Sequence, residues 1–392
     1  MPMKKSLIPV FSALFLLVSS AAAFSAPLSS KELLGKYIFY DTRLSCPTGQ
    51  SCSSCHDPKT GYADPDCAMP TSQGAVSSRF GSRNAPTASY ACFSPDFQQD
   101  PKTGEYVGGQ FWDGRAKDLA EQAKGPFLNP VEMNNPNKAS VVKKVLSSCY
   151  RNLFIKVYGG RVRCDVGKAY DDIADAIAAY ESTREVNRFT SKYDYYLAGK
   201  VDLTDDEKKG LELFKGKGNC ASCHPCEPSC GKPPLFTTFK YYNVGVPKNP
   251  ENPFYCMPPI YNPDGVNFID LGLGKTVGSD LENGKMKVPT LRNCAASSPY
   301  MHNGVFRTLG QVLGFYNEKA KGEDEGGGAD SCGDSGSDAG SGGMMSLEPE
   351  VKENITDIGN KRMCWQHDLP KLEAFLMTLT DGYVPVACGP VK

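Results

Sequence analysis

The chain has 392 residues, with 43 basic and 44 acidic side chains and a formal net charge of −1. A near-neutral chain with dispersed basic residues lacks the one-sided positive surface that nucleic-acid binding requires, so that class of function is excluded. The length exceeds what one hydrophobic core usually organises, so we expect two domains.

The first residues have the composition of a secretory signal peptide. Lys4 and Lys5 precede an apolar run over residues 7–18, and three alanines follow at residues 21–23. The run is shorter than the roughly 20 residues that a membrane-spanning helix needs, which favours a cleaved peptide over residues 1–23 rather than an anchor. No later stretch is long and apolar enough to span a bilayer. We therefore expect an exported protein in the periplasm or at the cell surface.

Two C-x-x-C-H motifs lie at residues 52–56 and 220–224. Paired thiols at this spacing can form thioethers with the vinyl groups of a haem, and the following histidine can bind its iron. The motifs use two of only four histidines, which makes coincidence remote. We predict two covalent c-type haems, each bound through two cysteines and one histidine. The predicted residues are Cys52, Cys55 and His56 for the first haem, and Cys220, Cys223 and His224 for the second.

The two motifs occupy equivalent places in an internal repeat. In each half a capped amphipathic helix precedes the motif. The first begins at residues 29–32 and the second at residues 204–207. In both, a Ser or Thr and a Glu three residues later can form a capping box. An apolar-periodic helix closes each half, around residues 173–180 and 369–379. The intervening Pro- and Gly-rich stretches indicate loops around a large prosthetic group.

This organisation predicts an all-α fold with two cytochrome c-like haem domains, long loops and little or no β-sheet. We expect the N-terminal haem domain over residues 24–195 and the C-terminal one over residues 196–392, with the boundary in residues 191–200. Residues 319–343 are rich in Gly, Asp and Ser and cannot bury enough apolar area to fold alone, so they are expected to form a mobile acidic loop.

Twelve of the sixteen cysteines lie outside the two motifs. In an oxidising compartment we expect most of them to form disulfides, whose connectivity the sequence does not fix. A metal cluster over residues 220–230 is excluded because haem attachment uses its first two cysteines. The twelve are Cys46, Cys67, Cys92, Cys149, Cys164, Cys226, Cys230, Cys256, Cys294, Cys332, Cys364 and Cys388.

Two histidines remain as further candidate iron ligands. His367 stands near Trp365 at the start of the last predicted helix, where a capping or surface role is expected. The sequence does not place Trp365 itself. His302 lies in the segment PYMHNG at residues 299–304.

That segment belongs to a set of motifs that closely resembles the bacterial di-haem cytochrome c peroxidase family. The set includes GQFWDGR at residues 109–115, NPVEM at residues 129–133 and VPTLRN at residues 288–293. The resemblance covers nearly the whole chain after the signal peptide, apart from the acidic loop. The segment FYN at residues 315–317 is similar to the MauG-like members of the family.

The MauG-like character rests on Tyr316. The resemblance implies that this tyrosine binds the iron of the His224 haem, where peroxidases of the family use a methionine. A phenolate oxygen is a hard anionic donor that lowers the reduction potential of iron, whereas a thioether raises it. In the alternative, Tyr316 is a core aromatic residue and Met301 is the ligand.

The first haem is expected to be five-coordinate and open to hydrogen peroxide. Peroxidases that need reductive activation carry a distal histidine at the place of Val76, and none stands near it here. The resemblance assigns acid–base catalysis of O–O cleavage to Glu132, an orienting hydrogen bond to Gln122, and narrowing of the access path to Pro126. A carboxyl group in a largely apolar pocket suits such proton transfer.

Two further roles follow from the resemblance. Trp112 matches a tryptophan that relays charge between the haems. A calcium ion is expected between the domains, bound by the side chain of Asn84 and the carbonyl oxygens of Ser297 and Pro299, since calcium prefers oxygen ligands.

The resemblance implies a peroxide-dependent enzyme that forms a high-valent state shared by two haem irons and oxidises tryptophan side chains of an exported partner protein. Gly218 replaces a surface tryptophan through which MauG receives electrons, so that route is missing. One alternative is a peroxidase that reduces hydrogen peroxide with electrons from a small cytochrome c or cupredoxin. A simple electron-transfer cytochrome is another, but it would have no use for Gln122 and Glu132.

Overall fold

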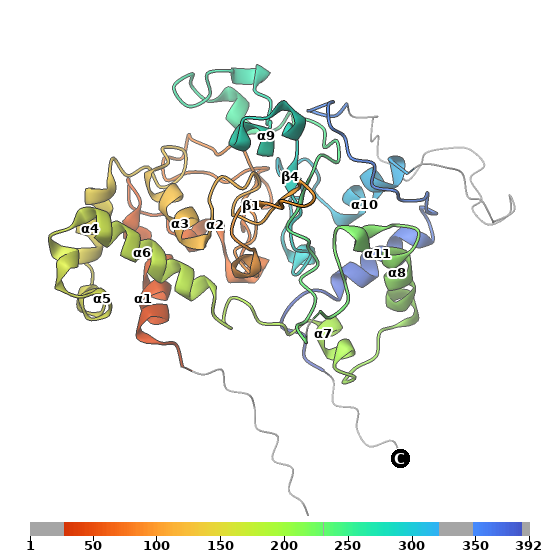
Figure 1. Ribbon diagram of the computed structural model, residues 1–392, viewed down its shortest axis with the longest axis horizontal. Coiled ribbons are helices and arrows are strands. Elements are labelled where there is room, and N and C mark those ends of the chain that lie inside the picture. Colours follow the sequence, from red (N-terminus) through yellow and green to blue (C-terminus); the bar gives the residue numbers. More distant parts are fainter. Residues whose placement is uncertain (1–26, 230, 321–347, 386–392) are drawn as a thin grey trace, which may run out of the picture.

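The computed structural model describes residues 27–229, 231–320 and 348–385 (Figure 1). The predicted signal peptide, most of the acidic loop, and the cysteines at positions 230, 332 and 388 lie outside these ranges. The helices are α1 (Ser30–Phe39), α2 (Cys52–Cys55), α3 (Leu119–Leu128), α4 (Lys138–Leu146), α5 (Arg151–Tyr158), α6 (Val166–Glu181), α7 (Lys192–Leu197), α8 (Asp205–Lys215), α9 (Leu273–Val277), α10 (Leu309–Glu318) and α11 (Asp368–Met377).

The prediction of a helical fold with little β-sheet is confirmed. In the described residues the sheets are two antiparallel pairs of two-residue strands. The strands are β1 (Gln98–Gln99) with β2 (Tyr106–Val107), and β3 (Tyr241–Tyr242) with β4 (Met286–Lys287). Long loops connect the helices and occupy the centre of the molecule (Figure 1).

The first half is organised by α1 crossing α6. The predicted capping box is present: Ser29 Oγ accepts from the backbone N–H of Glu32 at 3.3 Å, and the Glu32 carboxylate accepts from the N–H of Ser29 at 2.6 Å. Gly35 allows the close crossing, because a Cβ at this position would lie 2.9 Å from Cβ of Tyr180. Helices α3 and α4 also pack on α6.

The second half repeats this arrangement with α8 and α11. Thr204 and Glu207 form the second capping box, with distances of 3.3 and 2.7 Å. Gly210 follows its cap at the same spacing as Gly35, and a Cβ there would lie 2.8 Å from Cβ of Phe375 in α11. In Figure 1 the pair α1 and α6 lies on the left and the pair α8 and α11 on the right. The repeat inferred from sequence is therefore a repeat of helix packing.

Each half has its own apolar cluster. The first extends from Leu34 to Val186 and the second from Tyr193 to Leu379. Helix α7 lies in the stretch predicted to hold the domain boundary, and its Tyr193 packs in the second cluster. The limits at 195 and 196 remain a prediction.

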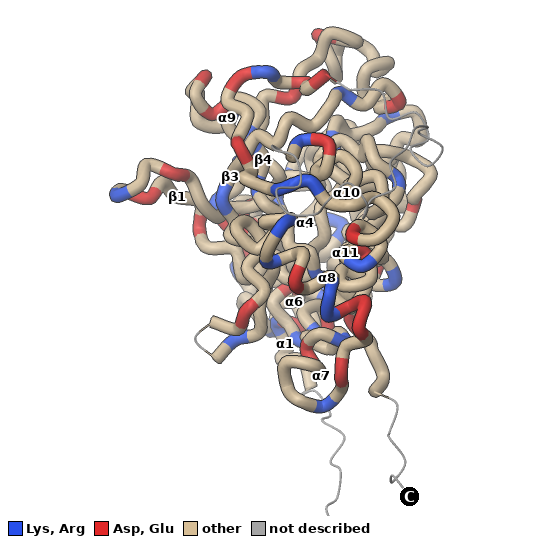
Figure 2. The backbone as a smooth tube through the Cα atoms, turned by 90° about the vertical axis from the view of Figure 1, so that its right-hand side faces the viewer, with Lys and Arg blue, Asp and Glu red and all other residues tan. Residues whose placement is uncertain are grey.

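Within the described residues, no helix is both long and apolar enough to cross a membrane. Basic and acidic residues alternate along the chain in Figure 2, with no one-sided basic stripe in that view.

Candidate active site

The first motif forms the short helix α2, with His56 directly after it. His56 Nδ1 lies 3.1 Å from the carbonyl oxygen of Tyr62. Since a carbonyl can only accept, Nδ1 carries the proton and Nε2 keeps its lone pair. Burial lowers the pKa of His56, so the ring is neutral at neutral pH. A neutral imidazole fixed through Nδ1 is suited to bind a metal through Nε2.

The second motif has the same arrangement. Its cysteines lie in and after a 3₁₀ turn, Cys220–Ser222, and His224 Nδ1 lies 2.7 Å from the carbonyl oxygen of Phe236. Burial lowers the pKa of His224 to about 4. Both motif histidines are therefore neutral, and the Nδ1 contact in each favours the tautomer with its lone pair on Nε2, which haem ligation requires.

Glu132 lies close to the first motif. Burial raises the pKa of the Cys55 thiol to about 12, with further contributions from the nearby carboxylates of Asp64 and Glu132. The pKa of Glu132 is itself raised by burial, against the opposing effects of Arg115 and a hydrogen bond from Asn129. The structure thus places a carboxyl group with an elevated pKa beside the first haem motif.

The segment that contains Val76 packs against Glu132. The backbone N–H of Ala75 donates to the carbonyl oxygen of Glu132 at 2.7 Å. Gly74 allows this approach, because a Cβ there would lie 2.8 Å from the carbonyl carbon of Val131. Position 76, where peroxidases that need reductive activation are expected to carry a distal histidine, therefore adjoins the segment of Glu132.

Gln122 and Pro126 lie on α3, four residues apart and so on one face of the helix. The turn after α3 brings Glu132 back toward that face, since the N–H of Met133 donates to the carbonyl oxygen of Pro126 at 3.1 Å. The backbone of Pro126 is therefore close to the segment of Glu132, Gln122 lies one turn earlier on α3, and the distal roles of these residues stay predictions.

Tyr316 lies on α10 near the second motif. Burial raises its pKa, and the nearby thiols of Cys223 and Cys220 contribute to the increase. Met301, the alternative ligand, instead lines a cavity between the two halves and has a left-handed backbone with φ 68°. The thiols of the second motif are thus close enough to Tyr316 to affect its pKa, and ligation of the iron by Tyr316 stays a prediction.

The cavity between the halves has a volume of about 150 Å³. Trp112 lines it, and its indole nitrogen donates to the backbone carbonyl of Asn84 at 2.8 Å. The ring of His302 makes an edge contact with Trp112, with centroids 6.5 Å apart. His302 is buried, and its Nε2 lies 3.7 Å from the Glu350 carboxylate and has no hydrogen-bond partner among the described residues. His367, by contrast, is an exposed N-cap residue, as expected.

Lys287 is a cavity residue that sequence reasoning missed. Its backbone N–H donates to the carbonyl oxygen of Trp112 at 2.8 Å, and its Nζ donates to the carbonyl oxygen of Gly109 at 2.5 Å. Burial lowers the pKa of Lys287 to about 7, against the opposing effect of Asp113. Its position directly before VPTLRN was the only available signal, and no local pattern marks it as a cavity residue.

The residues predicted to bind calcium meet in the same cavity. Asn84, Ser297 and Pro299 all line it, and Asn84 Nδ2 donates to the carbonyl oxygen of Pro299 at 2.6 Å. This contact presents the amide nitrogen, not its oxygen, so calcium binding remains a prediction. Among the described residues there is also no group of three or more His, Cys, Asp or Glu side chains able to hold a metal ion.

The cysteine prediction differs from the structure. None of the thirteen described cysteines forms a disulfide, and Cys226 and Cys294 are buried thiols. The expectation of several disulfides is therefore not supported within the described ranges. It came from cysteine number and compartment alone, which carry no information on distance.

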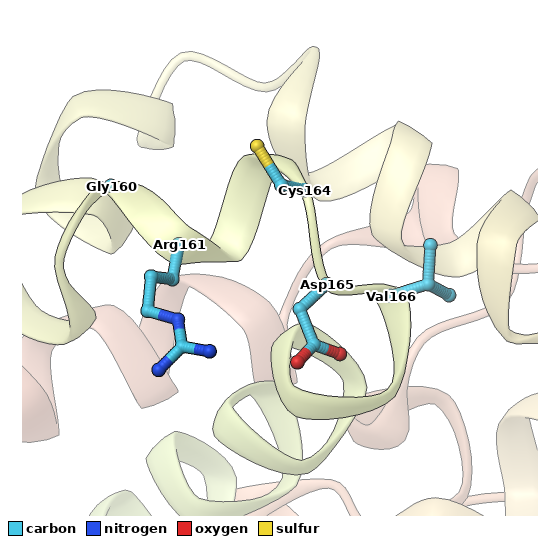
Figure 3. A pocket seen from close by; sticks show the side chains of 5 residues that line it. All are labelled: Gly160, Arg161, Cys164, Asp165 and Val166. Carbon is cyan, nitrogen blue, oxygen red and sulfur yellow. The ribbon is translucent and has the colours of Figure 1, made fainter.

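A larger hollow of about 740 Å³ lies at the connection that leads from α5 into α6 (Figure 3). It is lined by Gly160, Arg161, Cys164, Asp165 and Val166. The Asp165 carboxylate caps α6 by accepting from the N–H of Lys168 at 3.0 Å. The hollow contains none of the predicted site residues.

The sequence is similar to those of known di-haem peroxidases. The sequence model of the family described as di-haem cytochrome c peroxidase matches residues 29–202. Methylamine utilization protein MauG of Paracoccus denitrificans is 37% identical over 89% of this chain and 88% of its own length. Cytochrome c551 peroxidase of Nitrosomonas europaea is 35% identical over 71% of this chain and 70% of its own.

Solved structures give the same result. The diheme peroxidase BthA from Burkholderia thailandensis has a TM-score of 0.75 and 32% identity, covering 93% of this chain and 90% of that one. A MauG-like protein associated with microbial copper homeostasis has a TM-score of 0.62 and 27% identity, covering 91% of each chain. The chain belongs to the di-haem cytochrome c peroxidase family. It is a haem-dependent oxidoreductase, and membership implies two c-type haems, which the paired cysteines and the two neutral histidines fit.

Proposed function

We propose that the protein is an exported, peroxide-dependent di-haem enzyme of the MauG type that oxidises tryptophan side chains of a partner protein. The observation that carries this proposal is the position of Tyr316, half-buried on α10 near Cys220 and Cys223. Burial disfavours the phenolate form, so a phenolate here needs a compensating cation, which an iron centre supplies. A hard anionic ligand favours storage of oxidising equivalents over uptake of electrons.

The proposed roles in the first half follow from geometry and charge. The haem supplies the iron at which peroxide binds and is reduced. Glu132, as a carboxylate, takes the proton from the near peroxide oxygen and returns it to the far one, so that the leaving group departs as water. Gln122 orients the peroxide or Glu132, and Pro126 narrows the path from solvent.

Between the halves, Trp112 carries charge from one haem to the other. Its N–H proton is held by the Asn84 carbonyl, a weak base, so loss of an electron leaves the proton on the ring. A calcium ion bound by Asn84, Ser297 and Pro299 would fix this region, after rotation of the Asn84 amide to present its oxygen. The proposed location is the periplasm, on the basis of the leader sequence.

The second candidate is a cytochrome c peroxidase that takes electrons from a small cytochrome c or cupredoxin. It is favoured by the identity of 35% to a cytochrome c551 peroxidase, close to the 37% to MauG. Mass spectrometry of co-exported proteins, from strains with and without this gene, distinguishes the two. Peroxide-dependent oxygen insertion at tryptophan supports the proposal. Its absence, together with rapid peroxide-dependent oxidation of a reduced cytochrome, supports the second candidate.

A further inference from the structure

Trp365 lies at the surface of the second half and packs on the helix that carries Tyr316. Its side chain is 37% exposed. A Cβ at position 314 of α10 would lie 3.0 Å from Cζ3 of Trp365 and closer still to Cη2, so only glycine accommodates the ring at this distance. The indole is therefore in direct contact with α10, two residues from Tyr316.

The segment before Trp365 is fixed to α10 by buried amides. Asn317 is 1% exposed, and it donates to the carbonyl oxygen of Met363 at 3.0 Å and accepts from the N–H of Met363 at 2.7 Å. Asn360 donates to the carbonyl oxygen of Tyr316 at 2.7 Å. These hydrogen bonds fix the segment that leads to Trp365 against α10.

The same segment crosses the residues that precede the second haem motif. The N–H of Lys361 donates to the carbonyl oxygen of Lys217 at 2.8 Å, and Asn219 donates to the carbonyl oxygen of Ile358 at 2.8 Å. Position 218 lies between these two contacts. Trp365 thus follows a segment that is hydrogen-bonded to the stretch leading into Cys220.

We propose that Trp365 is the residue through which the second half exchanges single electrons with a partner in solution. The inference rests on the proposed function. Tryptophan is among the most easily oxidised side chains, and the other tryptophan, Trp112, lies between the halves. Helix α10, about 10 Å across with its side chains, separates the indole from the Tyr316 face.

The electron balance is simple. Trp365 gives one electron to the peroxide-oxidised centre and becomes an indole cation radical, which an electron from the partner returns to the neutral indole. Two such cycles supply two electrons, which with two protons convert one hydrogen peroxide to two waters. Without a partner, two-electron oxidation of the indole and addition of water give a hydroxylated ring, two protons and the same two electrons.

The experiment exposes the ferric holoprotein to excess hydrogen peroxide without a reductant and maps the products by peptide mass spectrometry. We expect Trp365 to gain an oxygen atom in the wild type. Glu132→Gln, which impairs the peroxide reaction, should leave Trp365 largely unmodified. In Trp365→Phe the oxidised state formed by one equivalent of peroxide should persist several-fold longer.

Two glycines of α10 provide a matched pair of variants. Gly314→Ala should displace the indole and reduce the yield of modified Trp365 several-fold. At Gly310 the nearest atom to an added Cβ would be 3.7 Å away, so Gly310→Ala should behave as the wild type. In a Trp112→Phe background Trp365 is the single tryptophan, and Gly314→Ala should shift its fluorescence to the red and increase its quenching by acrylamide.

The results of this experiment distinguish failure of the proposed function from failure of the role of Trp365 alone. If peroxide leaves the spectrum of the wild type unchanged, the proposed function fails and this inference fails with it. If the spectrum responds, three results each overturn the role of Trp365 alone: no oxygen at Trp365, an equal amount in Glu132→Gln, or preferential modification of Tyr242, the partly exposed tyrosine near Cys223.

Discussion

Trp112 and Asn84 are joined by a hydrogen bond of 2.8 Å from the indole nitrogen to the backbone carbonyl oxygen, which links the aromatic residue between the two halves to a proposed calcium ligand. The Asn84 side chain in turn reaches the Pro299 carbonyl oxygen at 2.6 Å. One residue therefore holds Trp112 with its backbone and spans the halves with its amide.

Asn84→Ala should destabilise the protein by about 1–3 kcal/mol, because it leaves the buried carbonyl of Pro299 without its donor. If calcium binds here, a chelator should change the haem spectrum of the wild type and have no further effect on the variant. Urea unfolding and absorption spectra measure the two effects. A chelator response of equal size in both proteins would place the ion elsewhere.

Glu132→Gln should lower the rate of the peroxide reaction by about 10²–10⁴-fold, because the proton transfer loses its base. The carboxylate is the active form and burial raises its pKa, so the wild-type rate should fall as the pH decreases through a value above the usual 4.5. The variant should lack this limb of the pH profile. Stopped-flow spectroscopy checks both statements.

Glu121→Gln is the matched control, since Glu121 lies on the exposed side of α3 and accepts a hydrogen bond that glutamine can also accept. It should keep the wild-type rate and pH profile. Equal losses in both variants would contradict a specific role for Glu132.

Tyr316→Met should raise the reduction potential of the second haem, because a neutral thioether favours Fe(II) whereas a phenolate favours the oxidised iron. Potentiometric titration of the two haems measures this shift. Tyr300→Phe, on the same half, should leave the potential near its wild-type value. A potential unchanged in Tyr316→Met would show that Tyr316 does not bind the iron.

Glu181 should make folding stability dependent on pH. It is 5% exposed, and burial raises its pKa to about 8 from the usual 4.5. The folded protein thus keeps the proton that the unfolded chain loses above pH 4.5, so stability should fall as the pH rises toward about 8 and then level off. The fall should be on the order of a few kcal/mol, at about 1.4 kcal/mol per pKa unit.

Glu181→Gln should remove most of this dependence, whereas Glu353→Gln, at an exposed position, should retain it. Urea midpoints at about pH 5, 7 and 9 provide the comparison. A wild-type midpoint that stays constant over this range would contradict the elevated pKa.

The features that the sequence predicted are local or carried by a motif. The capping boxes at Ser29 and Thr204 need only a glutamate three residues later, and the haem motifs are five residues long. The resemblance allowed Glu132 and Tyr316 to be named, and the structure then brought each near its motif. Their roles stay predictions.

The features that the sequence did not predict depend on contacts between distant segments. The Nζ of Lys287 donates to the carbonyl oxygen of Gly109, which is 178 positions away in the sequence. The residues next to Lys287 in the sequence do not indicate that it lines a cavity. Trp365 could not be placed because its position depends on the fit of its ring to Gly314. The expected disulfides are not formed among the described cysteines, since cysteine number does not determine distance.

The measurement that tests the central claim most directly is the spectrum of the as-isolated ferric protein, before and after one equivalent of hydrogen peroxide. We expect one high-spin five-coordinate haem, bound by His56, and one six-coordinate haem, bound by His224 and Tyr316. Peroxide should change the spectrum immediately, without prior reduction of either haem. Two low-spin six-coordinate haems that ignore peroxide until one of them is reduced would contradict it.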